Sequence, residues 1–166
     1  MLHFKKTAYN WLTFSRNLPP CYDKNGHSIH HTKFGEIFVL SAQTRDILFL
    51  LLNGKLFFAF WCFLGDDFDL TNWMFGDFPF DLAKLQLKTI NELLPLADKL
   101  ENVMEHAISF KLNAGKKVGN YNLAKCRDVT DKSDLIFANH IGLSSILDDI
   151  ELLYRQIVRT NFSEEE

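Results

Sequence analysis

The sequence predicts an α+β protein that is mostly helical, with a small N-terminal β-sheet or hairpin and a helical C-terminal half. Residues 1–44 hold two short aromatic-rich stretches separated by turn residues. Residues 45–81 begin with a long apolar run, and residues 82–162 repeat apolar side chains at the spacing of a helix. The length of 166 residues suits a single domain or a fragment of a larger protein.

Residues 1–44 are predicted to form short strands and loops. Residues 7–15, TAYNWLTFS, alternate in part and are typical of a short strand, and residues 35–41, GEIFVLS, predict a second strand. Between them, two consecutive prolines and an Asn-Gly pair are typical of turns. Ser41 or Thr44 is the expected cap of the helix that follows.

Residues 45–81 are predicted to form a buried helix and an acidic loop. The run ILFLLLNGKLFFAFWCFL contains eighteen residues, the lower limit for a membrane-spanning helix. A lysine at a bilayer centre costs about 2.5–3.5 kcal/mol. Because Lys55 lies in the middle of the run, we expect a helix that is buried in protein. Asn53 and Gly54 are poor helix formers, so a kink is expected there.

Residues 82–162 are predicted to form a helical region. Its first helix is expected to extend to about residue 112, and Pro95 is expected to produce a kink or a junction of two helices. The narrow apolar seam of this helix consists of Leu87, Ile90, Leu94, Ala97, Leu100, Met104 and Ala107.

The end of the chain is predicted to contain a loop, two helices and a frayed tail. Residues 113–133 are rich in Gly, Asn and Lys and are expected to form an ordered loop. Ser133 is the expected N-cap of a short helix that Gly142 ends. One of the next two serines is expected to cap the last helix, and residues 163–166 are expected to fray.

Charge is distributed unevenly along a chain whose net charge is only −3. Residues 1–33 and 111–132 are basic, whereas residues 34–110 and 133–166 are acidic. A polyanion would contact only the basic segments; alternatively, the four segments neutralise one another in the fold. The three cysteines form no CxxC pair and the N-terminus has no signal-peptide pattern, so we expect reduced thiols in a cytoplasmic protein.

Motifs for catalysis and metal binding are weak in this sequence. NLPPCY at residues 17–22 has two prolines and an aromatic residue, as in a motif that holds a target amine, but Leu18 and Cys21 change its spacing and favour a rigid turn. HSIHH at residues 27–31, with Asp23 nearby, lacks a fourth ligand at motif spacing. We therefore expect neither catalytic nor metal-binding residues.

Paired carboxylates in GDDFD are the remaining sign of metal chemistry. Asp66, Asp67 and Asp69 are of the type that holds Mg²⁺ in nucleases. A restriction-type nuclease would also need an acidic residue followed two positions later by Lys, and EIF at residues 36–38 lacks that Lys. An acidic loop is favoured, and a metal-dependent nuclease is kept as a third alternative.

Residues 111–127 combine cations with Asn and Tyr side chains and with glycines that let a ligand approach the backbone. Cations contact phosphates, whereas Asn and Tyr hydrogen-bond or stack on nucleotides. The segment is therefore a nucleic-acid contact or a solvated basic loop. The candidate DNA-binding residues are Lys111, Lys116, Lys117, Asn120, Tyr121, Asn122, Lys125 and Arg127, with Arg16, Tyr22 and Lys24 of the first basic loop as secondary candidates.

The order of these segments resembles the C-terminal region of N6-adenine DNA methyltransferases of restriction–modification systems, in particular the large single-chain, type IIG-like enzymes. In that family a helix of the form LLNS-LFFWFW precedes a polar loop, a short segment ending in FP and a long helical region. The matching segments here are Leu51-Leu52-Asn53-Gly54, Leu56-Phe57-Phe58, Phe60-Trp61, Asp66-Asp67 and Asp77-Phe78-Pro79. The resemblance continues through KLNAGKKVGNYNLAKCR and ELLYRQIV, and it covers roughly residues 9–162.

This resemblance implies a target-recognition part that contacts double-stranded DNA beside a methyltransferase catalytic core. The family's cofactor loop and catalytic motif are absent from this chain, so we expect no enzymatic activity and no cofactor here. S-adenosylmethionine, and Mg²⁺ where the parent enzyme cleaves DNA, would bind elsewhere in that enzyme. Gly54 replaces the commoner serine, a change expected to matter little for the fold. The alternative function is docking onto a methyltransferase core or a second copy, without DNA contact.

Overall fold

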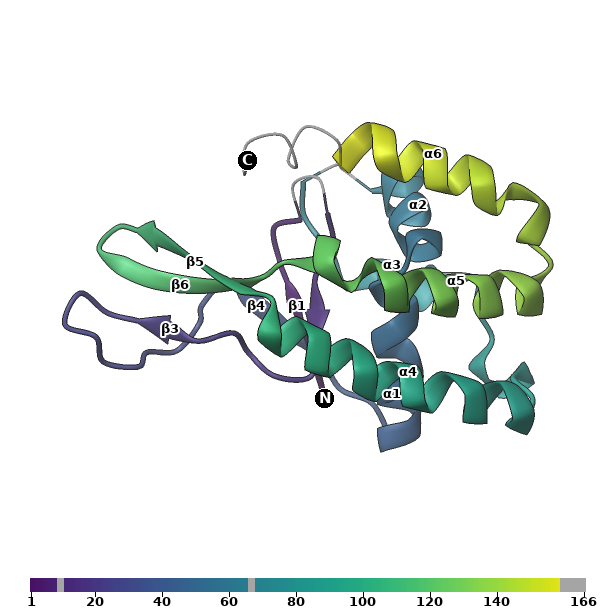
Figure 1. The fold of residues 1–166 in the computed structure, drawn as a ribbon, viewed down its shortest axis with the longest axis horizontal. Helices are drawn as coiled ribbons and strands as arrows, with labels where there is room; N and C mark the ends of the chain where they lie inside the picture. The colour runs from purple at the N-terminus through teal and green to yellow at the C-terminus, as the bar shows by residue number, and fades with distance from the viewer. Residues whose placement is uncertain (9–10, 66–67, 159–166) are drawn as a thin grey trace.

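Two small antiparallel sheets and a set of helices make up the protein, as seen in a computed structural model that describes residues 1–8, 11–65 and 68–158 (Figure 1). The first sheet has the strand order β2-β1-β4 and lies against the helices. The second has the order β3-β6-β5 and extends away from them, at the left of Figure 1. The prediction of a mostly helical α+β fold is confirmed.

The first sheet is built around β1, Leu2–Lys5, which pairs with β2, Phe14–Ser15, and with β4, Phe34–Ile37. The second predicted strand, residues 35–41, is therefore present as far as Ile37, whereas among the described residues of the strand predicted at 7–15 only Phe14 and Ser15 belong to a sheet. β1 was missed because its sequence, LHFK, is short and is followed by a second lysine. Its alternating Leu2 and Phe4 side chains are buried in the core, which fixes the strand there.

The apolar run forms two helices, α1, Ala42–Leu52, and α2, Lys55–Leu64, bent by 66° relative to each other. The break falls at the predicted position. Asn53 stabilises it, because its Nδ2 donates to the carbonyl oxygens of Phe14 and Phe49 and its Oδ1 accepts from Phe14 N. The predicted cap is also confirmed, since Ser41 Oγ accepts a hydrogen bond from the backbone N of Thr44 at 3.0 Å.

Among the described residues, no single helix is both long enough and apolar enough to cross a membrane. The pair α1 and α2 reaches the required length and composition only together, across the bend. Most of their large side chains lie in the core, where Phe49, Phe57 and Trp61 are almost fully buried.

The ammonium group of Lys55 is buried among carboxylates, which explains how a lysine is accommodated in an apolar run. Its Nζ lies 2.8 Å from Asp131 of α5 and 2.5 Å from Glu151 of α6, and its side chain is 9% exposed. Both Asp131 and Glu151 also contact Arg127. The cluster therefore ties α2 to α5 and α6 through balanced charges.

Gly54 is the N-cap of α2 and has no side chain with which to cap it. A Cβ at this position would lie 2.1 Å from Asp134 Oδ1, far inside van der Waals contact. The expectation that glycine at this position matters little for the fold is therefore wrong for this chain. The helix start and Asp134 are fitted to each other.

After α2, where an acidic loop was predicted, the structure contains a short helix, α3, Trp73–Asp77. Phe75, which lies within α3, and Phe78, just after it, pack on Phe57 with ring centroids 6.1 and 5.3 Å away. The short 3-10 turn η1, Leu82–Lys84, then leads to the long helix. This part of the chain covers α2 with aromatic rings.

The long helix α4, Leu87–His106, is continuous, with Pro95 inside it, so of the two alternatives, a kink or a junction of two helices, the junction is wrong. Proline removes one backbone donor and crowds the preceding turn, but the buried side chains of Leu93, Ala97, Leu100 and Met104 hold the helix against the core. The predicted seam is therefore wrong at Leu94, whose place Leu93 takes, and at Leu87, which is 72% exposed. The helix ends six residues earlier than predicted, at His106 rather than residue 112.

The segment expected as the end of that helix and a loop is instead a β-hairpin, formed by β5, Ile108–Asn113, and β6, Lys116–Tyr121. Its two-residue turn places Ala114 and Gly115 at φ 48° and 77°. Positive φ at both turn residues is the geometry of a type I′ hairpin turn, which usually carries Asn-Gly. Alanine in the first position hid the hairpin from the sequence pattern.

Four helical elements complete the described chain: η2, Leu123–Cys126, α5, Arg127–Ile141, the short turn η3, Ser144–Ile146, and α6, Leu147–Val158. α5 begins six residues before the predicted Ser133 cap, but Gly142 ends it with φ 76°, as predicted. The serines expected to cap the last helix lie in η3, a 3-10 turn. The predicted frayed tail lies outside the described residues.

Candidate nucleic-acid interface

The most distinctive surface is the second sheet, which we call the arm: strands β5 and β6 with β3, Cys21–Tyr22. In this register Cys21 pairs with Val118, and Val118 pairs with Lys111. Successive side chains of a strand point to opposite faces of a sheet. The arm therefore has two faces, and Lys111 lies on the opposite face from Phe110.

One face, which we call the basic face, gathers lysines from separate parts of the chain. It comprises Lys5 of β1, Lys33 before β4, Lys111 of β5 and Lys116 of β6. The pKa of Lys5 is lowered, first by burial and then by the positive charges of Lys33 and Lys111. Lys5 Nζ donates to Asn120 Oδ1 at 3.3 Å, a neutral partner. The ammonium groups of Lys5, Lys33 and Lys111 therefore lie close enough together to repel one another.

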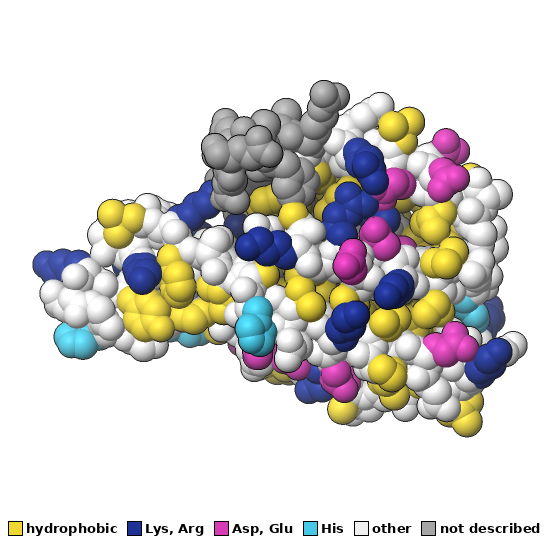
Figure 2. All heavy atoms as spheres, viewed as in Figure 1, with side chains coloured by type: hydrophobic (Ala, Val, Ile, Leu, Met, Phe, Trp, Pro, Cys, Tyr) yellow, Lys and Arg dark blue, Asp and Glu magenta, His cyan; other side chains and the backbone are white. Residues whose placement is uncertain are grey.

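These lysines form no ion pair with any carboxylate in the part of the chain that the structure describes. Figure 2 shows Lys and Arg side chains beside the Asp and Glu side chains over the helices, whereas the visible side of the arm at the left carries Lys or Arg side chains without Asp or Glu side chains next to them. An uncompensated basic cluster favours a polyanionic partner.

A hollow of about 140 Å³ opens on the basic face. His30, Lys33, Asn113 and Lys116 line it, together with the buried His31. The pKa of His31 is lowered mainly by burial, and the nearby positive charges of Lys5 and Lys33 lower it further. The hollow therefore combines hydrogen-bonding groups with positive potential, as an anion site requires.

The structure brings together several of the predicted candidates on the arm. Lys111, Lys116 and Asn120 lie on the basic face, while Lys117 and Tyr22 lie on the other face of the arm. Beyond the arm's strands, Lys24 is exposed in the turn after β3 and Lys125 is exposed in η2. These cations are accessible to a ligand.

Tyr121 and Asn122 have internal roles instead. The Tyr121 hydroxyl donates to the carbonyl oxygen of Asn17 at 3.1 Å, and burial raises the pKa of Tyr121 to about 12. Asn122 Oδ1 accepts from Ala124 N and so caps η2. Both side chains position the base of the arm rather than face a ligand.

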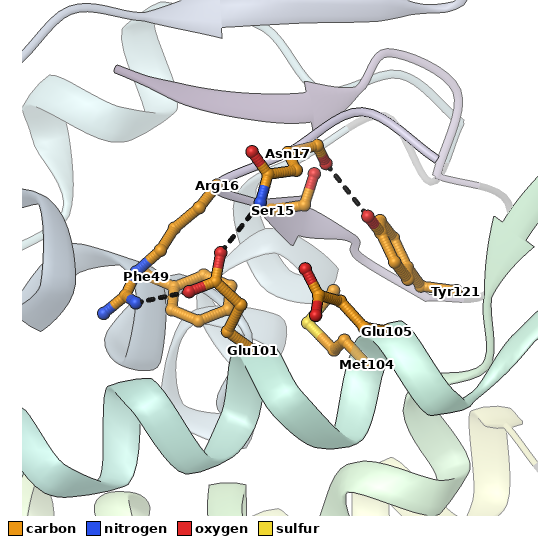
Figure 3. Close-up of a pocket in the computed structure, with 8 residues that line it drawn as sticks. All are labelled: Ser15, Arg16, Asn17, Phe49, Glu101, Met104, Glu105 and Tyr121. Atoms are coloured by element: carbon orange, nitrogen blue, oxygen red, sulfur yellow. Dashed lines mark hydrogen bonds and ion pairs between the residues drawn. The ribbon is translucent and has the colours of Figure 1, made fainter. Parts of the chain in front are cut away.

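Arg16 and Arg127, the two predicted arginines, are held in ion pairs within the protein. Figure 3 shows Arg16 and Tyr121 beside a cavity of only about 10 Å³, with Arg16 directed at Glu101. Arg16 also lies 3.0 Å from Asp46 and 2.9 Å from Asp98. Arg127 contacts Glu151 in the buried cluster at Lys55. Sequence reasoning could not separate these structural cations from accessible ones.

Two residues of the basic face, Lys5 and Lys33, were not among the sequence candidates. Both belong to the basic segment at residues 1–33, whose charge was the available signal. They lie far from Lys111 in the sequence, and the pairing of β3 with β6, together with the hydrogen bond from Lys5 to Asn120, brings the two basic segments together.

The candidate metal ligands do not converge. Among the described residues, no three His, Cys, Asp or Glu side chains are placed to hold a metal ion together. The Asp23 carboxylate instead accepts hydrogen bonds from the backbone N of Asn25 and of His27, which orders its own turn. Asp66 and Asp67 lie outside the described residues.

The chain was compared with known proteins, and no protein-family model, curated protein or solved structure matches it.

Proposed function

We propose that the chain binds double-stranded DNA through the basic face of the arm. The observation that carries this proposal is the meeting of Lys5, Lys33 and Lys111 without a described carboxylate to compensate them. Bringing like charges together opposes folding. A duplex that contributes phosphates would relieve the repulsion and release its own counterions.

The shape of the arm supports a duplex as the partner. It extends from the helical body in Figure 1, so both its faces are reachable. A β-ribbon can enter the major groove of B-DNA, and β5 and β6 form such a ribbon, with β3 beside β6 at Lys117 and Val118 and the edge of β5 left open in the described chain. Lys111 and Lys116 on the ribbon, with Lys33 at its side, would contact phosphates.

We further propose that the chain acts as the DNA-contacting, non-catalytic part of a restriction–modification N6-adenine methyltransferase, in the cytoplasm. The sequence resemblance supports this. The catalytic core, with its S-adenosylmethionine, would lie on a separate part of the enzyme. The ion pairs of Arg16 and Arg127 are consistent with a rigid body that presents the arm.

The test is a titration of fluorescent duplex DNA at several salt concentrations. Binding through phosphates weakens by about 0.9 log units per phosphate for each log unit of salt. We expect the double variant Lys33→Gln/Lys111→Gln to bind more weakly and to lose about two units of slope. The control variant Lys88→Gln/Lys99→Gln changes two exposed lysines of α4 and is expected to bind like wild type. Binding that is independent of salt, or equal losses in both variants, would contradict the proposal.

A second candidate function is docking onto a methyltransferase core or onto a second copy. It is favoured by large apolar side chains at the surface, notably Phe38, 79% exposed, and Phe63, 74% exposed. Light scattering at increasing concentration tests self-association. A dimer that Phe63→Ser abolishes, without any DNA binding by the monomer, would favour docking over DNA contact.

A further inference from the structure

The face of the arm opposite the lysine cluster has a different chemistry, and we call it the aromatic face. It consists of Tyr22, Phe110, Leu112 and Lys117. Phe110 is 42% exposed and Leu112 is 83% exposed, so neither belongs to the hydrophobic core. Figure 2 shows hydrophobic side chains along the arm with Lys or Arg side chains beside them.

Two rings of this face form a partly open platform. The ring centroids of Tyr22 and Phe110 lie 6.1 Å apart with an angle of 37° between the ring planes. The ammonium group of Lys117 lies over the Phe110 ring, 4.5 Å from its centroid. The pairing of Lys117 with Tyr22 across β6 and β3 holds both in place. A cation and two partly exposed rings therefore lie together at the surface.

A hollow of about 650 Å³ adjoins this platform, and Lys24 lines it together with the residues of the aromatic face. Its one lining carboxylate, Asp23, accepts hydrogen bonds from the backbone N of Asn25 and of His27, each at 2.8 Å. The Asp23 carboxylate is thus engaged within its own turn. Lys24 and Lys117 give the hollow a positive balance.

Aromatic rings with adjacent ammonium groups match the two parts of a nucleotide. A nucleobase stacks on an aromatic ring whatever its sequence, while a cation contacts the phosphate beside it. Within a duplex the bases are already stacked on one another, so a free π-face is offered only by an unpaired base. The size and openness of the hollow suit such a planar group.

We propose that the aromatic face binds an unpaired nucleobase, which stacks on Phe110 while Lys117 and Lys24 contact the adjacent phosphates. This inference rests on the proposed DNA contact of the basic face, which would hold the neighbouring paired region. Lys117 is exposed and has no described carboxylate partner. An arriving base therefore displaces its ammonium from the ring and leaves it free for a phosphate.

The experiment compares two fluorescent duplexes that differ only in one unpaired 2-aminopurine bulge. Wild type is expected to bind the bulged duplex more tightly and to quench the 2-aminopurine through stacking. Phe110→Ala is expected to bind the bulged duplex about tenfold more weakly and the fully paired duplex as wild type does. Phe38→Ala, which changes an exposed Phe outside the arm, is the matched control and should leave both affinities unchanged. Thermal unfolding followed by circular dichroism checks that each variant is folded.

The outcomes separate the two proposals. Equal affinity of wild type for both duplexes, or equal losses on both in Phe110→Ala, would overturn base stacking and leave the basic face standing. If Lys33→Gln/Lys111→Gln binds the fully paired duplex as tightly as wild type and still prefers the bulge, stacking is supported and phosphate contact by the basic face is overturned. No binding of either duplex by wild type would overturn both.

Discussion

The side chain of Asp134 on α5 caps the N-terminus of α2, because its Oδ2 accepts a hydrogen bond from the backbone N of Lys55 at 3.0 Å. Helices are usually capped by the residue just before their first turn. Here that residue is Gly54, which provides no side chain, and the cap comes from a helix 79 residues further along the chain. The hydrogen bond that caps α2 is therefore also a tertiary contact between α2 and α5.

Gly54→Ala is expected to destabilise the protein by about 2 kcal/mol, because the new methyl group collides with Asp134. In an Asp134→Ala background the same change should cost much less, since the colliding carboxylate is gone. Unfolding in urea measures all three variants. The control is Gly76→Ala within α3, where a Cβ meets nothing within 4 Å. Equal costs of Gly54→Ala in both backgrounds would contradict the fit described for Asp134.

The stability that Asp134 contributes is expected to fall as pH rises from about 4 to 7. Burial raises the pKa of Asp134 to about 7, above the value of about 3.9 in an unfolded chain. The folded state therefore binds this proton more tightly, and its contribution is complete below pH 4 and lost through pH 7. Asp134→Asn should remove this slope in measurements of the unfolding free energy at several pH values.

A separate acid-side effect comes from Glu151, whose pKa is lowered to about 2 by hydrogen bonds from Lys55, Arg127 and Arg155 that outweigh its burial. Its contribution is present above pH 4.5 and lost as pH falls towards 2. The two windows do not coincide, so Glu151→Gln should leave the slope between pH 5 and 7 unchanged. A changed slope there would contradict the assignment to Asp134.

Arg16→Gln is expected to destabilise the protein by about 3 kcal/mol, because it removes the buried cation that Asp46 and Glu101 share and leaves Asp46 with Arg45 alone. DNA affinity of the folded fraction should stay within about threefold of wild type, since Arg16 is 8% exposed and internally paired. Urea unfolding and a DNA titration measure the two effects. A stable variant with weak DNA binding would instead place Arg16 at the interface.

Lys111→Gln is expected to raise the pKa of Lys5, because it removes one of the two positive charges that lower it. Lys117→Gln, on the opposite face of the arm, should leave the pKa of Lys5 unchanged and is the matched control. Titration followed by NMR of the Lys5 side chain reports both. Equal shifts of the Lys5 pKa in the two variants would show that Lys117 acts on Lys5 as strongly as Lys111 does, which would contradict the assignment of the two lysines to opposite faces.

Ala114→Asn is expected to stabilise the hairpin by about 0.5 kcal/mol, since Asn tolerates the left-handed φ of 48° better than Ala. Ala114→Val should destabilise it, because a β-branched side chain strains this conformation. Thermal unfolding compares the two. A hairpin turn of another type would show no such difference.

The elements that could be predicted are those whose formation depends on residues close to them in the sequence. The break at Asn53-Gly54, the Ser41 cap and the Gly142 helix end follow from neighbouring residues, and the sequence predicted all three. The β5–β6 hairpin was missed because its turn lacks the usual Asn. Strand β1 was missed because it gains its stability from pairing with β2 and β4 rather than from its own composition.

The residues of the candidate site likewise fall into those that neighbouring residues reveal and those that depend on distant contacts. The lysines of residues 111–117 were predictable from their density, since exposed basic side chains cluster in the sequence. Whether a cation is free or paired depends on distant partners, as Arg16 with Glu101 and Arg127 with Glu151 demonstrate. The aromatic platform of Tyr22 and Phe110 joins two segments 88 positions apart, which no local pattern reveals.

Because β3 pairs with β6, the two faces of the arm combine residues that are synthesised at different times. Lys5 and Lys33 leave the ribosome early, whereas Lys111 and Lys116 follow only after most of the helices. A nascent chain therefore carries half of the basic face and one ring of the aromatic platform. Only when β6 pairs with β3 are both surfaces complete, so the proposed binding faces assemble after β6 has been synthesised and do not depend on the helices α5 and α6 that follow it in the sequence.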